Sequence, residues 1–314
     1  MDTFSALRDD DAARQYLEQL RWPAGTVCPH CGVIGHSYKT PTTGRYRCAE
    51  KACRKDFTVT VNTPMERSHI ALHKWLQAFH LMCSSKKGVS AHQLHRTLGI
   101  TYRSAWFMAH RIRECMRTGG LAPLGGEGKV VEVDETYFGN IPEAERRPFK
   151  TSGRLYSKNP GGFKHKRAII SLVERGGSVR SFHAPGAYAE TVVPIVRENI
   201  DRESRLHTDE SPLYKRVGQE FAAHETVKHS DYEYVRGDVM TNTVESYFSV
   251  FKRGMRGVYQ HCKEKHLHRY LAEYDFRYNH RSALGIEDGE RAALAIKSAD
   301  GKRLTYRNAN STGL

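Results

Sequence analysis

The spacing of apolar residues predicts that the first half of the chain is mostly helical, with one strand-like interruption. Apolar side chains at helical spacing predict a short amphipathic helix over residues 5–20. Short strand-like pieces follow at 46–48 and 57–61, in a stretch rich in Gly, Cys and Thr. Between residues 68 and 116 the spacing predicts three successive helices, the last two separated by a tight turn at Gly99.

Beyond a linker rich in Gly and Pro, over residues 121–128, the pattern changes to strands and helices. The predicted elements, in chain order, are strands at 129–133, 167–173 and 179–183, a helix at 190–199, a strand at 204–208, and helices at about 242–253 and 264–280. Residues 138–164 are polar and rich in Gly and Pro, so we expect a long surface loop there. After about residue 300 we expect a frayed tail.

The charge of the chain indicates what kind of partner it binds. The 314 residues include 49 Lys and Arg against 35 Asp and Glu, a net charge of +14, which favours a polyanionic partner. Between Arg67 and Arg117 there are nine basic residues and one acid, Glu114. Helix, short turn with Gly, helix is the layout of a helix-turn-helix, so this stretch predicts a DNA-binding module. The alternative is a three-helix packing unit with a solvated basic face.

The start of the last helix in this module is where base edges and phosphates come within reach of a recognition helix. The candidate DNA-binding residues are therefore Thr101, Tyr102, Arg103 and Ser104.

Composition excludes a disordered chain and a membrane span. Hydrophobic residues make up 39% of the chain, enough for a packed core. No apolar run approaches the roughly 18 residues that a membrane span needs. The start of the chain is acidic, whereas a signal peptide begins basic and then apolar. We therefore expect a cytoplasmic, nucleoid-associated protein with no membrane partner.

Four of the seven cysteines lie in one short stretch. Cys28 and Cys31 form one closely spaced pair, Cys48 and Cys53 a second, and 16 residues separate the pairs. Structural Zn²⁺ sites use four tetrahedral thiolate or imidazole ligands presented by such paired turns. The sequence therefore predicts a zinc ribbon, although four ordinary buried thiols are the alternative. His30 and His36 could each replace a thiolate, but four thiolates already complete the shell.

Two predicted strands deliver acids. The strand that begins at Val130 leads to Glu132, Asp134 and Glu135, and alternation places Glu132 and Asp134 on one face and Glu135 on the other. A second short strand ends in Asp209. Each acid has an ordinary alternative: Glu132 or Glu135 as a surface acid, and Asp209 as the cap of the turn that follows.

A third acid, Glu245, lies early in a helix that starts near Asn242. It could do no more than close a capping box with Asn242. Carboxylate oxygens are the ligands that Mg²⁺ prefers, and two such ions can activate an attacking oxygen and stabilise a leaving one. Acids at the ends of different elements could converge on such a site.

Three motifs together resemble a known family. The runs are Val133-Asp134-Glu135-Thr136-Tyr137-Phe138-Gly139, His207-Thr208-Asp209, and Asn242-Thr243-Val244-Glu245-Ser246-Tyr247-Phe248-Ser249-Val250-Phe251-Lys252-Arg253-Gly254. They resemble the first, second and third acid motifs of bacterial insertion-sequence DDE transposases, in particular the group with an N-terminal zinc ribbon, an ISXO-type catalytic domain and a Glu followed seven residues later by Lys. The separations (209 − 134 = 75 and 245 − 209 = 36) match the family's order and scale. The resemblance covers about residues 15 to 290.

The resemblance implies a multidomain α/β protein with an RNase H-like catalytic core, a mixed sheet flanked by helices. The predicted order of strands and helices agrees with this. By carry-over, Asp134, Asp209 and Glu245 would be catalytic and would hold two Mg²⁺ ions, or Mn²⁺ in their place. Lys252 would touch DNA near the cleaved end, with Arg253 beside it; a solvated basic residue is the alternative for Lys252. Related groups have an Asn as third member, so Asn242 competes with Glu245.

The implied activity is transposition: binding of double-stranded DNA at terminal inverted repeats, nicking of the 3′ ends, and joining to target DNA by two-metal phosphoryl transfer. Two DNA ends must be held together, so the resemblance implies a homodimer or larger assembly on DNA. Two rivals remain: a DNA-binding regulator without catalysis, and a metal-dependent nuclease that does not join ends. The predicted domains are a helix and zinc ribbon (1–62), a helix-turn-helix module (63–120), the catalytic domain (128–295) and a tail (296–314).

Overall fold

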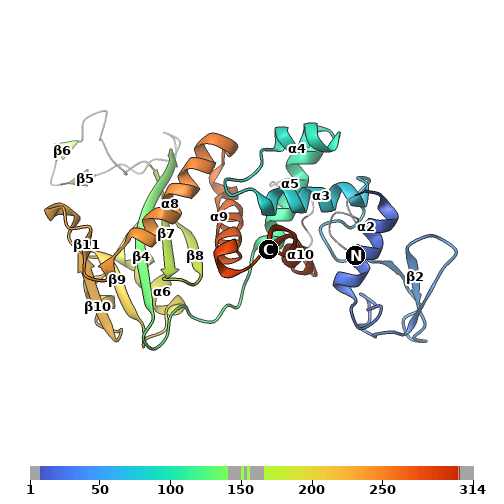
Figure 1. Cartoon of the computed structure of the whole chain (residues 1–314), viewed down its shortest axis with the longest axis horizontal. Coiled ribbons are helices and arrows are strands. Elements are labelled where there is room, and N and C mark those ends of the chain that lie inside the picture. Colours follow the sequence, from blue (N-terminus) through green and yellow to red (C-terminus); the bar gives the residue numbers. More distant parts are fainter. Residues whose placement is uncertain (1–7, 141–149, 152–153, 156–165, 303, 305–314) are drawn as a thin grey trace. The chain divides into compact units, whose positions relative to one another are not determined.

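The computed structural model of the chain describes residues 8–140, 150–151, 154–155, 166–302 and 304. It divides into two compact units (Figure 1). Unit 1 comprises residues 1–118 together with 280–314, and unit 2 comprises residues 119–279. Among the described residues, no helix combines the length and the apolar character needed to cross a membrane.

Unit 1 begins with a helix that packs on a small antiparallel sheet. Helix α2 (Asp10–Arg21) starts where the side chain of Asp9 accepts a hydrogen bond from the backbone N–H of Ala12. The sheet comprises β1 (Ser37–Lys39), β2 (Arg45–Cys48) and β3 (Asp56–Thr58), in that order. Its core is three rings, 5.5–5.8 Å between centroids, contributed by Trp22, Tyr46 and Phe57. This ring cluster stabilises a sheet too small to have a core of its own.

The helical module of unit 1 has the three predicted helices and one that the sequence analysis missed. The predicted ones are α3 (Leu72–Ser84), α4 (Ala91–Leu98) and α5 (Tyr102–Met116). The turn between α4 and α5 places Gly99 at φ 58°, a left-handed conformation that glycine adopts without a Cβ clash. The missed helix, α10 (Asp288–Lys297), packs on α3, α2 and α5, and the short 3₁₀ turn η4 (Ser282–Leu284) precedes it.

The placement of α10 corrects the predicted domain boundaries. We predicted a catalytic domain to residue 295 and a tail from 296, a division that cuts α10. The guanidinium of Arg291 on α10 donates to the carbonyl oxygen of Cys83 on α3, 3.1 Å away, and this contact helps to hold α10 in unit 1. Unit 2 therefore ends at Asn279, and the predicted ribbon and helix-turn-helix domains belong to one unit. Most of the predicted tail lies outside the described residues.

Unit 2 is built around a five-stranded mixed sheet of order β10-β9-β4-β7-β8. Its strands are β4 (Val130–Asn140), β7 (Lys166–Glu174), β8 (Val179–Ala184), β9 (Arg205–Asp209) and β10 (Ala223–Val227). Strands β4, β7 and β8 form an antiparallel meander, whereas β9 and β10 are parallel to β4. This topology is that of an RNase H-like fold, as expected.

Helices cover both faces of this sheet. Helix α6 (Ala189–Asn199) and the short α7 (Lys215–Gly218) lie on one face, where Val131 and Val133 pack. Helices α8 (Asn242–Gly254) and α9 (Glu264–Asn279) lie on the other face, where Phe138 packs (Figure 1). A π-helical turn, η3 (Met255–Tyr259), follows α8. Successive side chains of β4 therefore point alternately to the α6 side and to the α8 side of the sheet.

Two details of unit 2 differ from expectation. Strand β4 pairs with β7 as far as Asn140, so Asp134 lies within this strand and not at its end. The parallel partner β9 stops opposite this point, which leaves the side of β4 next to Asp134 open for other groups. Residues 138–140 of the predicted loop (138–164) belong to β4, and the loop contains the short pair β5 (Lys150–Thr151) and β6 (Arg154–Leu155); its remainder lies outside the described residues.

The segment between β10 and α8 was not predicted. It contains a 3₁₀ turn, η2 (His229–Asp231), and a short hairpin of β11 (Val235–Arg236) and β12 (Val239–Met240). Strand β10 itself was also missed, because its three central residues are His, Glu and Thr, so it lacks the apolar residues that indicate a strand.

Candidate functional site

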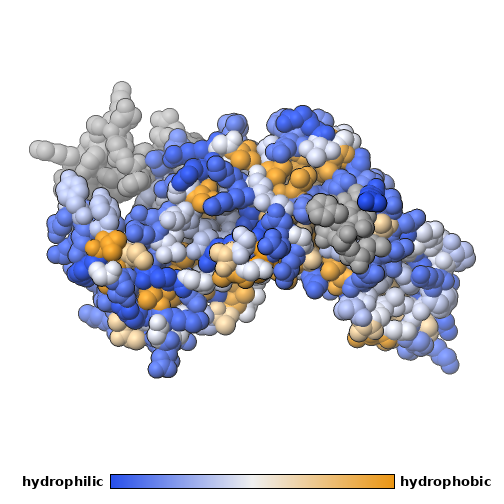
Figure 2. Space-filling model, viewed as in Figure 1, coloured by the Kyte–Doolittle hydropathy of each residue, from blue (hydrophilic) through white to orange (hydrophobic). Residues whose placement is uncertain are grey.

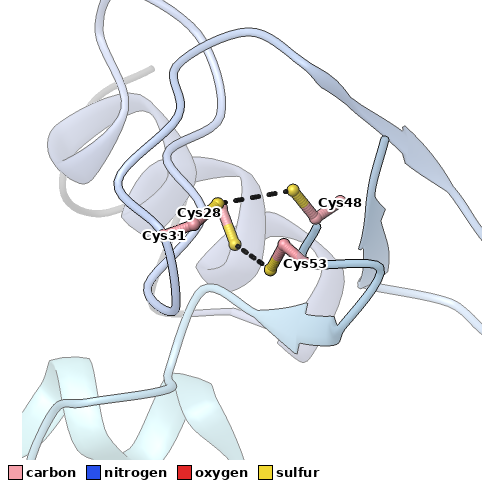
Figure 3. A group of neighbouring side chains, drawn as sticks. All are labelled: Cys28, Cys31, Cys48 and Cys53. Carbon is pink, nitrogen blue, oxygen red and sulfur yellow. Dashed lines mark hydrogen bonds between the residues drawn. The ribbon is translucent and has the colours of Figure 1, made fainter. Parts of the chain in front are cut away.

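The four predicted zinc ligands come together in unit 1. Cys28 and Cys31 lie in the turn before β1, Cys48 ends β2, and Cys53 lies in the turn before β3 (Figure 3). Their sulfur atoms all lie within 4.8 Å of one another, and the Cys28–Cys53 and Cys31–Cys48 pairs are 3.8 and 3.6 Å apart. A tetrahedron of Zn–S bonds of about 2.3 Å has edges of about 3.8 Å.

Backbone hydrogen bonds shape the two cysteine turns. The N–H of Gly32, at φ 76°, donates to the carbonyl oxygen of Cys28, and the N–H of Cys53 donates to that of Glu50. The sulfur spacing and this turn geometry fit one structural Zn²⁺ ion held by four thiolates.

The purified chain should therefore carry about one Zn²⁺, and C28S should lose most of it. Because the ribbon core is three rings, C28S should also expose the ribbon to proteolysis. Metal content by atomic emission checks the first result and limited trypsin digestion the second. C262S, in unit 2, is the control; unchanged zinc in C28S would show that Cys28 is not a ligand.

The second candidate site lies in unit 2, on the face of the sheet covered by α8. Register places Glu132 on β4 opposite His207 on β9, so two residues further along Asp134 and Asp209 lie at the same level. Both have the parity that faces α8. Glu245 is in the first turn of α8. The structure therefore brings the three predicted acids to one region, from two parallel strands and one helix.

The acids act on one another electrostatically. Burial raises the pKa of Asp134 to about 8, and nearby carboxylates act in the same direction, in decreasing order Glu135, Asp209 and Glu245. Burial also raises the pKa of Asp209, with a further contribution from Glu210. Among the described residues, only the four cysteines form a metal-type cluster within 4.8 Å. The acids thus repel one another without closing a cage around one ion.

The ordinary alternatives for the acids can now be judged. Asp209 does accept a hydrogen bond from the N–H of Ser211, so it caps its turn and also faces the site. Glu245 forms no capping box with Asn242: the hydroxyl of Thr241 donates to it at 3.2 Å. The side-chain amide of Asn242 donates to the sulfur of Met240, 3.7 Å away.

Glu132 is not the surface acid of the alternative interpretation, because its side chain is fully buried. Its carboxylate accepts hydrogen bonds from the backbone N–H groups of Thr243 and Val244, at 2.8 and 3.0 Å, and from the Thr243 hydroxyl. Arg175 donates two more from Nε and Nη2. Glu132 thus fastens the first turn of α8 to β4, two residues from Asp134.

Arg175 extends this connection to the segment before α8. Its guanidinium also donates to the carbonyl oxygens of Asp238 and Met240, at 2.9 and 3.4 Å. The ion pair of buried Glu132 with half-buried Arg175 therefore ties β4, the β11–β12 hairpin and the start of α8 together. Sequence reasoning placed Glu132 on the correct face, but no pattern in the sequence identified its partners.

His229 is a further residue that the sequence analysis missed. Its Nε2 is 3.5 Å from a carboxylate oxygen of Glu245 and 3.3 Å from the hydroxyl of Thr241. Its charge, when protonated, lowers the pKa of Asp209. His229 therefore lies between the second and third acids. It follows the unpredicted β10, so sequence patterns gave no reason to single it out.

Lys252 and Arg253 differ in their surroundings. Burial lowers the pKa of Lys252, with contributions from Arg256 and Lys166, whereas the charge of Asp134 opposes the shift. The charge of Asp134 thus acts on Lys252, which lies two helical turns after Glu245 on α8. Arg253 is exposed and donates to the hydroxyl of Ser249 on its own helix.

The predicted recognition-helix residues in unit 1 lie at the start of α5. Thr101 caps this helix, because its hydroxyl accepts from the N–H of Ser104 and donates to the Ser104 hydroxyl. Tyr102 is exposed and stacks on His92 of α4, 4.3 Å between centroids. Arg103 is also exposed. One of the nine basic residues counted in this stretch, Arg113, is buried, and a half-buried second one, Arg111, donates to the carbonyl oxygen of Pro64.

Comparison with known families matches both units. The family model described as ISXO2-like transposase domain matches residues 123–279, and the transposase zinc-ribbon domain matches residues 8–56. A relative from Halobacterium salinarum (strain ATCC 700922 / JCM 11081 / NRC-1), named an uncharacterized protein in transposable element ISH50, is 30% identical over 257 residues. The matched region covers 78% of this chain and 84% of the relative.

Solved structures show weaker similarity. The Mos1 transposase paired-end complex with left transposon end has a TM-score of 0.30 at 12% identity, over 68% of this chain and 75% of that chain. The Mos1 strand transfer complex has a TM-score of 0.28 at 11% identity, over 69% and 75%. Similarity at this level carries no argument, so the fold assignment rests on the sheet topology and the two family models.

Proposed function

Because the chain belongs to the ISXO2-like transposase family, with that family's zinc ribbon, we propose that it cleaves DNA at the ends of its element and joins them to target DNA. Asp134, Asp209 and Glu245 are the proposed catalytic acids. The observation that carries this proposal is their placement: Asp134 and Asp209 lie at the same level of two parallel strands, and Glu245 lies in the first turn of the helix that covers this face of the sheet.

The acids fit a divalent metal site. Carboxylates that raise one another's pKa in a buried location carry an unfavourable concentration of negative charge, which cations relieve. Their oxygen atoms suit Mg²⁺ or Mn²⁺. Asp134, Asp209 and Glu245 would hold two such ions, which would activate the attacking oxygen and stabilise the leaving oxygen.

The other residues of the site have supporting roles in this proposal. Lys252, held near Asp134 by α8, would contact the phosphate next to the cleaved bond, with Arg253 on the outer side of the helix. In unit 1, Thr101, Tyr102, Arg103 and Ser104 at the start of α5 would bind the terminal inverted repeat. Since two ends must react together, the active form would be a homodimer or larger assembly on double-stranded DNA.

Proton binding gives a prediction that does not require DNA. The pKa of Asp134 in the folded protein is about 8, above its ordinary value of 3.8, so the metal-free protein should lose stability as pH rises through this range. The melting temperature in EDTA should fall between about pH 5 and 8, and less so in D134N. Mg²⁺ should raise the melting temperature more at about pH 8 than at about pH 5, because fewer protons compete with it for the carboxylates at the higher pH. Equal Mg²⁺ shifts at both ends would contradict a proton-coupled metal site at Asp134.

The products of the reaction test the proposed function. The full chain is incubated with Mg²⁺ and a duplex that carries the inverted repeat flanking its own gene. Nicks at the 3′ end of the repeat followed by joined products would support a transposase. Nicks without joining would favour a metal-dependent nuclease, and binding without cleavage would favour a DNA-binding regulator.

A further inference from the structure

Three large side chains that follow β10 are exposed to solvent near the three candidate acids. The segment of residues 228–236, here named the tyrosine loop, follows β10 and ends with β11. Tyr232 is 83% exposed, Tyr234 52% and Val235 51%. The β10–β11 region, at the left of Figure 1, has a surface in Figure 2 that mixes pale and orange patches with blue. Large apolar side chains kept in water by a folded segment favour a binding role.

The tyrosine loop is held in shape by its own hydrogen bonds. The N–H groups of His229 and Ser230 donate to the carboxylate of Glu210, at 2.8 and 3.0 Å. The N–H of Tyr232 donates to the carbonyl oxygen of His229, and that of Glu233 to Lys228. Tyr232 adopts φ 59°, which is uncommon for a bulky residue and has a conformational cost. These hydrogen bonds therefore hold the tyrosine loop in one shape, although the backbone conformation of Tyr232 costs some stability.

This loop is continuous with the acid site. His229, which contacts Glu245 at 3.5 Å, also packs its ring against Tyr234, with centroids 5.2 Å apart. Tyr232 is three residues from His229, a reach of at most about 11 Å of chain. Successive nucleotides of one strand of a duplex are about 3.4 Å apart, so both tyrosines lie a few nucleotides from a DNA strand held at the three acids.

The chemistry of the loop fits bases better than phosphates or a protein. Its two cations, Lys228 and Arg236, are balanced by Asp231 and Glu233, so it offers no net attraction to a phosphate backbone. A stable protein interface needs about 20–30 residues on each side, whereas here three apolar side chains are interspersed with charged ones. Aromatic rings stack on any base, whatever the sequence.

We propose that Tyr232 and Tyr234 stack on unpaired bases of the DNA strand a few nucleotides from the cleaved phosphate, and so hold the opened end at the acids. This inference rests on the proposed function for the identity of the DNA, but its test does not require cleavage.

Binding is measured in EDTA with the full chain and two fluorescent duplexes of the flanking repeat, one blunt and one with three unpaired terminal nucleotides. Wild type should bind the second duplex more tightly. Y232A/Y234A should lower that preference by about 5- to 100-fold, and Y232F/Y234F should keep it. The matched control is Y188A, because Tyr188 is 56% exposed but precedes α6 on the opposite face of the sheet. 2-Aminopurine at the unpaired positions should be quenched by wild type and the Phe variant only.

Equal binding of both duplexes by wild type, or an unchanged preference in Y232A/Y234A, would overturn the proposal. So would an altered oligomeric mass of that variant with its preference intact, which would assign the loop to a protein contact. Failure of the proposed function has a different signature, namely no cleavage by wild type in Mg²⁺ whatever the binding preference.

Discussion

D134A, D209A and E245A should each reduce cleavage at the element's end by about a thousandfold or more, with DNA affinity nearly unchanged. Each substitution removes one carboxylate from a site proposed to bind metal ions that stabilise transition-state charge by several kcal/mol, and about 4 kcal/mol corresponds to a factor of a thousand. Affinity should hold because the contacts to phosphates come from basic residues, and the loss of a negative charge does not weaken them. Gel analysis of cleaved ends and fluorescence anisotropy in EDTA measure the two quantities.

Two further variants sharpen this experiment. E190A is a matched control for E245A, because Glu190 lies in the first turn of α6, exposed and on the opposite face of the sheet. N242A tests the competing assignment of the third acid. We expect both to cleave like wild type; a greater loss in N242A than in E245A would transfer the role to Asn242. Three acid variants that cleave normally would refute the catalytic assignment.

The second large effect is expected at Glu132. E132A should destabilise unit 2 by about 2–4 kcal/mol, because it removes the buried acceptor of two N–H groups of α8 and of the half-buried guanidinium of Arg175. E132Q should lose less, since one amide oxygen still accepts. All three tryptophans, Trp22, Trp75 and Trp106, lie in unit 1. Hydrogen exchange of the Thr243 and Val244 amides is therefore the more direct measurement.

An acid in a surface ion pair, Glu220, provides the control for E132A. Glu220 pairs with Arg197 and Arg202 at the surface, so E220A should cost much less stability than E132A. If E132A and E220A unfold at the same denaturant concentration, Glu132 does not hold α8 to β4. Cleavage by E132Q reports the same connection, because a displaced first turn of α8 also displaces Glu245 from Asp134.

Much of the fold could be predicted because its strands and helices carry local signals. The alternation in β4 predicted which residues share a face, and this placed Asp134 with Glu132 and apart from Glu135. The strand β10 and the helix α10 were missed for different reasons. The residues of β10 are mostly polar, and α10 has no partner near it in sequence: it packs on helices formed about 200 residues earlier.

The sequence by itself determined the chemistry: four cysteines spaced for one zinc ion, three acids in a family's order, and a basic helical stretch. These depend on residue type and short spacing, which local sequence contains. Only the tertiary structure decided which residues contact these acids. It buried Glu132 against α8, placed His229 between two acids, and presented Tyr232 and Tyr234 beside them. Those contacts join residues that are up to about a hundred positions apart, and their energies arise from desolvation and charge proximity that exist only after folding.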